Sequence, residues 1–259
     1  PAAYGVDTTG LILGDYSNGN DGLVIKEGDS VEDIKGHNVN LVELSVSHYF
    51  LARALDIHGM SERDVTVVNT SDADAVSTFM TDDVTVAAVW NPQLGIILDE
   101  APKATEVFTS KEIPGEIIDM MAANTEVLEA NPEFGKALVG AWFETLALMQ
   151  GDSAEAKAAR TYMAEQAGTD LAGYEAQLDD TMLFYTPESA YEFASNKDLI
   201  GFMDKVRQFS FDKGLLGEGS PSPDVIGMEF GDASVLGDKS NIKLRFDTTY
   251  VKMAADGEL

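Results

Sequence analysis

Short β-rich runs alternate with helical stretches between residues 10 and 118. The runs predicted as strands are 11–13, 23–25, 39–44, 65–68, 84–90 and 106–108. The segments predicted as helices are 47–59, 72–80 and 92–98. Strands that alternate with helices of this length are typical of βαβ units and a mostly parallel sheet.

Helical spacing dominates after Met120. Apolar residues recur every three or four positions over 133–149, which predicts an amphipathic helix. A second helix is expected over 154–168, where Gly168 closes it. Two further helices are expected over 187–194 and 199–216, followed by a Gly/Ser/Pro loop over 217–223.

The alternation of strands and helices is interrupted twice, near Lys26–Gly28 and near Ile113–Gly115. Two interruptions predict that one lobe is inserted into another, with a ligand cleft between them. We therefore expect an α/β fold of two lobes. The inserted lobe would span 28–113, and the outer lobe would combine 1–27 with 114–259.

Composition and charge narrow the classes of partner. The chain has 45 acidic residues against 17 Lys plus Arg, a formal net charge of −28. Such a surface repels phosphate backbones and anionic lipid, so no nucleic-acid partner and no membrane insertion are expected. The acidity either serves solubility or attracts cationic solutes. The absence of cysteine excludes disulfides and thiolate metal sites.

A polar loop over 14–22 is the first candidate for chemistry. Asn-Gly and Asp-Gly pairs favour tight turns, so the loop is explained as a hairpin with Asx turns. The alternative is a ligand loop in which amides and carboxylates contact a polar solute. Its candidate contacts are Asp15, Asn18, Asn20 and Asp21.

Two further candidates lie where a predicted strand ends and a helix begins. Ligands of open α/β sheets sit at the carboxyl ends of strands, and helix N-termini offer free N–H groups. The first candidate comprises Glu43, Ser45, Ser47 and His48, which either cap the helix or contact a ligand. The second is Trp90, which either packs in the core or forms the wall of a ligand pocket.

Glu116, at the second interruption, is either a hinge-side acceptor or an exposed residue. No catalytic arrangement is found: the three histidines lack metal-ligand spacing, and the sequence has no nucleophile elbow and no phosphate-binding loop. We therefore expect no enzyme activity, no cofactor and no metal.

Seven stretches in family order resemble the substrate-binding proteins of nitrate/sulfonate/taurine-type ABC importers, and above all the branch labelled as urea transporter binding proteins. They are GDYSNGNDGLVIK (14–26), KGHNVNLVELSVSHYFLARAL (35–55), DVTVVNTSDADAV (64–76), VWNPQL (89–94), IPGEIIDMMAANTEVL (113–128), DKVRQFSFDKGLLG (204–217) and LRFDTTYVKMAADG (244–257). The resemblance implies a type II periplasmic-binding fold that captures a solute by lobe closure. It also implies an extracytoplasmic monomer that delivers a small-molecule solute to an ABC transporter membrane permease.

The sequence departs from this family pattern in two ways. Relatives begin earlier, with a signal peptide and a first strand–helix–strand unit. This sequence starts at Pro1, and we expect both to be missing from it. Sulfonate-type relatives tend to have Gly-Ser where Leu44-Ser45 stands here, and Glu43 disfavours an anion. We therefore expect a nitrogen-rich solute such as urea or guanidine and a role in nitrogen uptake.

Three alternatives remain at this point. The first is a binding protein for a small sulfonate such as taurine. The second is an enzyme of the same fold of the kind that makes the thiamine pyrimidine, although such enzymes carry a Cys-rich segment that this chain lacks. The third is a ligand-sensing regulatory domain, which the acidic charge and the lack of a helix-turn-helix region oppose.

Overall fold

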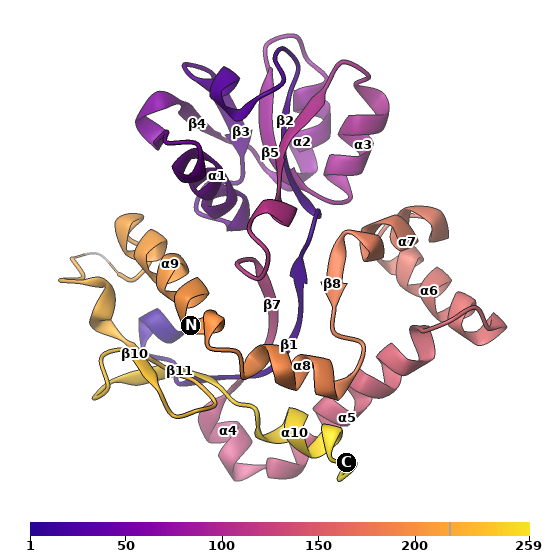
Figure 1. Ribbon diagram of the computed structural model, residues 1–259, viewed down its shortest axis with the longest axis vertical. Coiled ribbons are helices and arrows are strands. Elements are labelled where there is room, and N and C mark those ends of the chain that lie inside the picture. Colours follow the sequence, from indigo (N-terminus) through magenta and orange to yellow (C-terminus); the bar gives the residue numbers. More distant parts are fainter. Residues whose placement is uncertain (218) are drawn as a thin grey trace. The chain divides into compact units, whose positions relative to one another are not determined.

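The computed structural model describes residues 1–217 and 219–259. The chain forms two compact units (Figure 1). Unit 1 comprises 1–16, 118–171 and 183–259, and unit 2 comprises 17–117 and 172–182. Of the loop predicted over 217–223, residue 218 lies outside the described residues.

Unit 2 is built on a sheet of five strands among its described residues, in the order β4-β3-β5-β2-β6. Its elements are β2 (Asp21–Ile25), β3 (Asn38–Leu41), α1 (Val46–Ile57), β4 (Thr66–Asn69), α2 (Asp72–Phe79), β5 (Val86–Trp90), α3 (Gln93–Glu100) and β6 (Thr105–Thr109). Strands β3, β4 and β5 are parallel, as βαβ connections require. The predicted mostly parallel sheet includes one antiparallel strand: β2 lies between β5 and β6, whereas β3, β4, β5 and β6 all run in one direction.

The helices of unit 2 cover both faces of its sheet, and successive side chains of a strand point to opposite faces. In β2, Leu23 and Ile25 join the core under α1, whereas Val24 between them joins the core under α2 and α3. Figure 1 shows α1 on one side of this sheet and α2 with α3 on the other. Both faces are buried, which is why these strands read as continuous apolar runs in the sequence.

Unit 1 contains a mixed sheet in the order β10-β9-β11-β1-β7, with β8 paired to β1. Its strands are β1 (Thr8–Ser17), β7 (Ile118–Asn124), β9 (Gly227–Glu229), β10 (Val235–Gly237) and β11 (Ile242–Phe246). Its helices are α4 (Thr125–Ala130), α5 (Pro132–Met149), α6 (Ala154–Gln166), α8 (Pro187–Ala194), α9 (Asp198–Asp212) and α10 (Thr249–Ala255). The segment between α6 and α8 forms α7 (Leu171–Asp179) and β8 (Thr181–Leu183).

One core cluster of unit 1 lies between its sheet and the helices α8 and α9. Leu13 of β1, Leu199 of α9 and Met228 of β9 belong to one buried cluster, in which the rings of Phe230 and Phe246 stack with centroids 5.0 Å apart. The strands after residue 220 supply part of this core, but the sequence pattern predicts only helices and loops there. Strands β9 and β10 have three residues each, which is too short to show a clear alternation of apolar and polar residues.

The two units are divided at other positions than the predicted lobes. Strand 23–25, assigned to the outer lobe from the sequence, is hydrogen-bonded between β5 and β6 in the sheet of unit 2. Segment 172–182 also belongs to unit 2, although residues 118–171 of unit 1 separate it from 17–117 in the sequence. Within the described residues, no helix is long and apolar enough to cross a bilayer.

Candidate functional site

Several of the candidate polar residues lie at one edge of the sheet in unit 2. The parallel strands β3, β4 and β5 end at this edge, at Leu41, Asn69 and Trp90. The antiparallel β2 starts there, since Asp21 pairs with Trp90. Strand β6 also ends there, since Thr109 pairs with Gly22. The carboxyl edge of such a sheet is where ligands of open α/β folds bind.

The start of α1 forms the centre of this edge. Ser45 caps the helix: its hydroxyl accepts from the Ser47 N–H at 3.1 Å and donates to the Val42 carbonyl at 2.6 Å. The first-turn N–H groups of a helix carry positive partial charge that favours an acidic group. We define the head of α1 as residues 44–47.

Ser47 is the one polar side chain at this head that is buried without a partner of its own. It is 4% exposed, and no described residue donates to or accepts from its hydroxyl. The hydroxyl oxygen is not one of the fully buried polar atoms that lack a hydrogen bond, so the hydroxyl can be reached from solvent. A ligand oxygen at the head of α1 would satisfy it.

His48 holds the turn that precedes the helix. Its Nδ1 accepts the Leu44 N–H at 3.1 Å, and its Nε2 lies 3.4 Å from Glu62 Oε2. Nδ1 is therefore the acceptor nitrogen, and Nε2 carries the proton toward the Glu62 carboxylate. The ring is 2% exposed. The structure thus uses His48, a predicted ligand residue, to fix the backbone of the head of α1.

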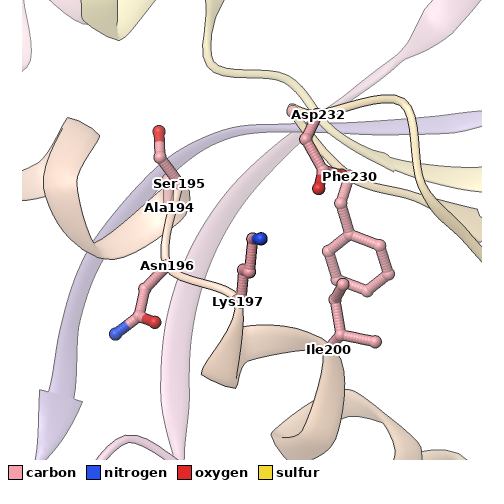
Figure 2. A pocket seen from close by; sticks show the side chains of 8 residues that line it. Ala194, Ser195, Asn196, Lys197, Ile200, Phe230 and Asp232 are labelled. Atoms are coloured by element: carbon pink, nitrogen blue, oxygen red, sulfur yellow. The ribbon is translucent and has the colours of Figure 1, made fainter.

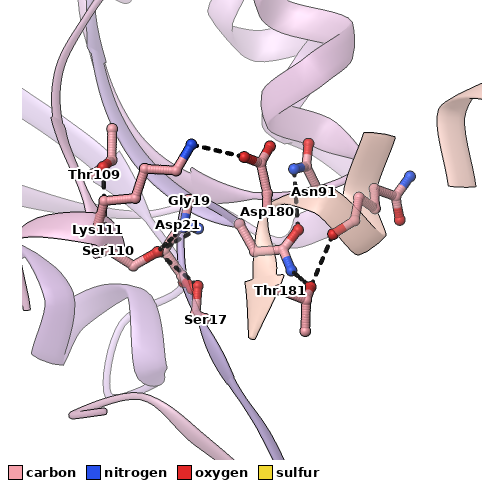
Figure 3. Close-up of polar contacts among 11 residues, drawn as sticks. Ser17, Gly19, Asp21, Asn91, Thr109, Ser110, Lys111, Asp180 and Thr181 are labelled. Carbon is pink, nitrogen blue, oxygen red and sulfur yellow. Dashed lines mark hydrogen bonds and ion pairs between the residues drawn. The ribbon is translucent and has the colours of Figure 1, made fainter. Parts of the chain in front are cut away.

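The polar loop after β1 is tied down by the 3-10 turn Ser110–Glu112 that follows β6 (Figure 3). The Ser110 hydroxyl lies 2.7 Å from the Ser17 hydroxyl and accepts the Gly19 N–H at 2.7 Å. Lys111 Nζ donates to Asp180 at 2.9 Å, and this bond raises the lysine pKa. The loop therefore has a defined shape, set by contacts within unit 2.

The predicted loop contacts Asn18, Asn20 and Asp21 are engaged in the same network. The Asn18 N–H donates to the Asp180 carbonyl at 2.9 Å. Asn20 donates to Thr181 and accepts from Asn91 Nδ2 at 3.1 Å. Asp21 is buried in β2. The loop is not a hairpin, because β1 and β2 join different sheets, and its role as a ligand loop stays a prediction.

Trp90 ends β5 and is half-buried at the edge, as expected for a residue at the carboxyl end of a strand. The next residue, Asn91, links two segments: its Oδ1 accepts the Gly95 N–H of α3 at 3.1 Å, and its Nδ2 donates to Asn20. Glu43 is exposed, and its N–H donates to Asn69 Oδ1 at 2.9 Å. The carboxylate of Glu43 is therefore free to stay in solvent.

Glu116 is 5% exposed, so the expectation of an exposed residue is wrong. Its carboxylate accepts from the Tyr49 hydroxyl at 2.8 Å and from Arg53 Nε at 2.7 Å and Nη2 at 3.2 Å. Burial and the adjacent carboxylate raise the pKa of Tyr49. These bonds tie the segment before β7 to α1, which makes Glu116 a structural residue.

Asp15 does not belong to the edge in unit 2. It lies in unit 1, on β1, where it pairs in register with Asp119 of β7. Burial and then the Asp119 carboxylate raise the pKa of Asp15 to about 7, and the two carboxyl groups share a hydrogen bond. One proton is therefore held between them near neutral pH.

A protein-family model described as "NMT1/THI5 like" matches residues 20–156, more than half of the chain. The chain belongs to the NMT1/THI5-like family. The match contains the edge from Asn20 onward, whereas residues 17–19 and the contacts of Asp180 and Thr181 lie outside it. A binding protein of Brucella abortus is 29% identical over 126 residues, which are 46% of this chain and 38% of that protein. The chain thus aligns with less than half the length of that relative.

Solved structures establish the fold of this NMT1/THI5-like chain. The periplasmic sulfonate-binding protein SsuA of Methylobacillus flagellatus has a TM-score of 0.71 at 14% identity, covering 98% of this chain and 71% of that one. The periplasmic aliphatic sulphonate binding protein SsuA of Escherichia coli has a TM-score of 0.66 at 19% identity, covering 82% and 67%. The desulfurization enzyme DSZB has a TM-score of 0.58 at 14% identity, covering 85% and 76%. The predicted fold class, a type II periplasmic-binding-protein fold, is confirmed.

Sequence reasoning missed the polar residues that follow β6 and β4. Ser110 and Lys111 follow the predicted strand 106–108 after Thr109, and Asn69 follows the predicted strand 65–68. The carboxyl-end rule that selected Ser45 and Trp90 would have selected them too. Lys111 also places a cation at this edge.

A small hollow in unit 1 lies between the start of α9 and the turn after β9 (Figure 2). Asn196, Lys197 and Asp232 are among its lining residues. Its volume is about 10 Å³, close to the space of a single water molecule. It is too small for an organic solute. The described residues contain no group of three or more His, Asp or Glu side chains placed to hold a metal ion.

Proposed function

We propose that this chain is the solute-binding component of an ABC importer and that it binds a small sulfonate at the head of α1. Family membership and the fold support the binding role. The observation that carries the solute class is the head of α1 itself, where the Ser47 hydroxyl and the partial positive charge of the first-turn N–H groups can serve a ligand, while Ser45 caps the helix. This set of donors suits the oxygens of an acidic group.

A nitrogen-rich cation at the head of α1 would need several carboxylates beside that head, and Asp15, Glu116 and Glu43 do not supply them. Asp15 belongs to unit 1, and Glu116 is already bonded to Arg53 and Tyr49. Glu43 is the one exposed carboxylate beside the head of α1. Its charge is hydrated and screened. The names of the similar solved structures also favour the sulfonate alternative over urea or guanidine.

The remaining parts of the proposal follow from the binding role. The protein would act in the periplasm or elsewhere outside the cytoplasm, as a monomer that delivers its solute to a membrane permease. Capture by lobe closure stays a prediction. The fold also occurs in a desulfurization enzyme, so the absence of enzyme activity rests on the binding role and not on the fold.

Calorimetric titration tests the solute class. We expect heat of binding with taurine or a simple alkanesulfonate, and none with guanidinium or urea. Ser47→Ala should weaken sulfonate binding by about tenfold, because a hydrogen bond to a charged group is worth roughly 1.5–3 kcal/mol. The matched control is Ser77→Ala on α2, an exposed serine whose hydroxyl donates to its own helix. Binding of guanidinium or urea with no sulfonate binding would overturn the proposal.

A further inference from the structure

Leu44 adopts a backbone conformation that side chains disfavour. Its φ is +64°, in the left-handed region, and among the described residues Ala233 is the one other non-glycine residue with a positive φ. Glycine is the usual residue at such a position because a Cβ is crowded there. The Leu44 N–H bond to His48 Nδ1 holds the backbone in place.

Packing does not account for leucine at this position. The Leu44 side chain is 46% exposed, and Val46 on the other side of Ser45 is 40% exposed. Two large apolar side chains therefore face solvent at the head of α1. A disfavoured backbone that carries an exposed apolar side chain gains nothing for the fold, and strain of this kind concentrates at functional sites.

A second, separate observation at the head of α1 concerns the hydroxyl of Ser47. The residue Ser47 is 4% exposed, and its hydroxyl bonds to no described residue, so it is available to a ligand oxygen. The head of α1 thus combines an available hydroxyl with an apolar surface. A bare inorganic anion would use the hydroxyl and leave Leu44 and Val46 in water.

We propose that Leu44 and Val46 determine specificity by binding the apolar substituent of an organic sulfonate, whose acidic group takes the Ser47 hydroxyl. The inference rests on the proposed function. It predicts a solute with an aliphatic or aromatic arm, in preference to methanesulfonate or an inorganic oxyanion. Glycine at position 44 would leave the acidic-group contacts in place and remove the contact with the arm.

The test compares hexanesulfonate with methanesulfonate by calorimetry on the full chain. Wild-type protein should bind hexanesulfonate at least tenfold more tightly. Leu44→Ala and Leu44→Gly should each lose about tenfold in affinity for hexanesulfonate, since each buried methylene contributes to binding. Their affinity for methanesulfonate should change by less than about threefold. Val46→Thr, which keeps the side-chain shape, should weaken hexanesulfonate binding in the same selective way.

Ala233→Gly is the matched control, because it relieves the same backbone conformation in unit 1. It should leave both affinities unchanged. Leu44→Gly should not lower the thermal unfolding midpoint, since glycine suits a φ of +64°. Equal loss of both sulfonates, or no loss of hexanesulfonate in the Leu44 and Val46 variants, would overturn the inference. Failure of wild-type protein to bind either sulfonate would instead overturn the proposed function.

Discussion

Glu116→Gln should destabilise unit 2 without changing solute binding. The Glu116 carboxylate is buried and accepts three hydrogen bonds, two from the Arg53 guanidinium and one from Tyr49. Glutamine has nearly the same shape but offers one acceptor oxygen and an NH₂ group. The substitution would therefore leave the Arg53 charge without its buried partner and place donors opposite donors.

The magnitude follows from burial. Removal of one partner from a buried ion pair typically costs about 3–5 kcal/mol. Arg53 keeps some contact with solvent and a second partner, since Nη1 lies 2.5 Å from Asp56. We therefore expect a loss of about 3 kcal/mol, at the lower end of that range. Asp56→Asn is the control: it breaks the exposed pair of the same arginine, which is worth about 0.2–1 kcal/mol.

Urea denaturation read by tryptophan fluorescence measures both variants. The chain has two tryptophans, and Trp142 lies against Gly14 in unit 1. A Trp142→Phe background therefore leaves Trp90 to report on unit 2 alone. A loss below about 1 kcal/mol for Glu116→Gln would refute the reasoning. So would a large loss of hexanesulfonate affinity in the folded variant, because that result would make Glu116 a ligand residue.

Two other predictions concern unit 1. The pKa of Asp15 is about 7 in the folded protein, against 3.8 for an ordinary aspartate. The folded state therefore binds a proton that the unfolded state releases, and the free energy of unfolding should fall by at most about 4 kcal/mol as the pH rises from about 4 to 7. Asp15→Asn should flatten this dependence in thermal melts, and an unchanged slope would contradict the assignment. Gly135→Ala should lower the melting temperature, because a Cβ would lie 2.7 Å from the Tyr250 ring. Gly140→Ala, on the same helix with open space around it, should raise the melting temperature, since alanine favours helix by up to about 1 kcal/mol.

The elements of unit 2 could be predicted from the sequence because both faces of its sheet are buried. Strands there read as apolar runs, and capping serines such as Ser45 and Ser71 mark the helix starts. The antiparallel direction of β2 could not be predicted from the residues of the strand itself. Strand direction depends on which sheet a strand joins, and the partners of β2 lie about 65 to 85 residues further along the chain.

The candidate site was predicted in part. The carboxyl-end rule correctly brought Ser45, Ser47 and Trp90 to one edge, as the parallel strands β3 and β5 require. It could not show that Glu116 would be bonded to Arg53, because that contact joins residues 63 positions apart. Nor could it show that Asp15 pairs with Asp119, since the register of β1 and β7 includes two irregularities.

The most direct test of the central claim is amide NMR during titration with hexanesulfonate. The account predicts that the largest shift changes fall on the N–H groups of the head of α1, residues 44–47. Smaller changes are expected at Trp90 and Lys111 on the same edge. Largest changes around the unit 1 hollow, at Asn196 and Gly231, or shifts at the head of α1 with guanidinium and none with hexanesulfonate, would contradict it.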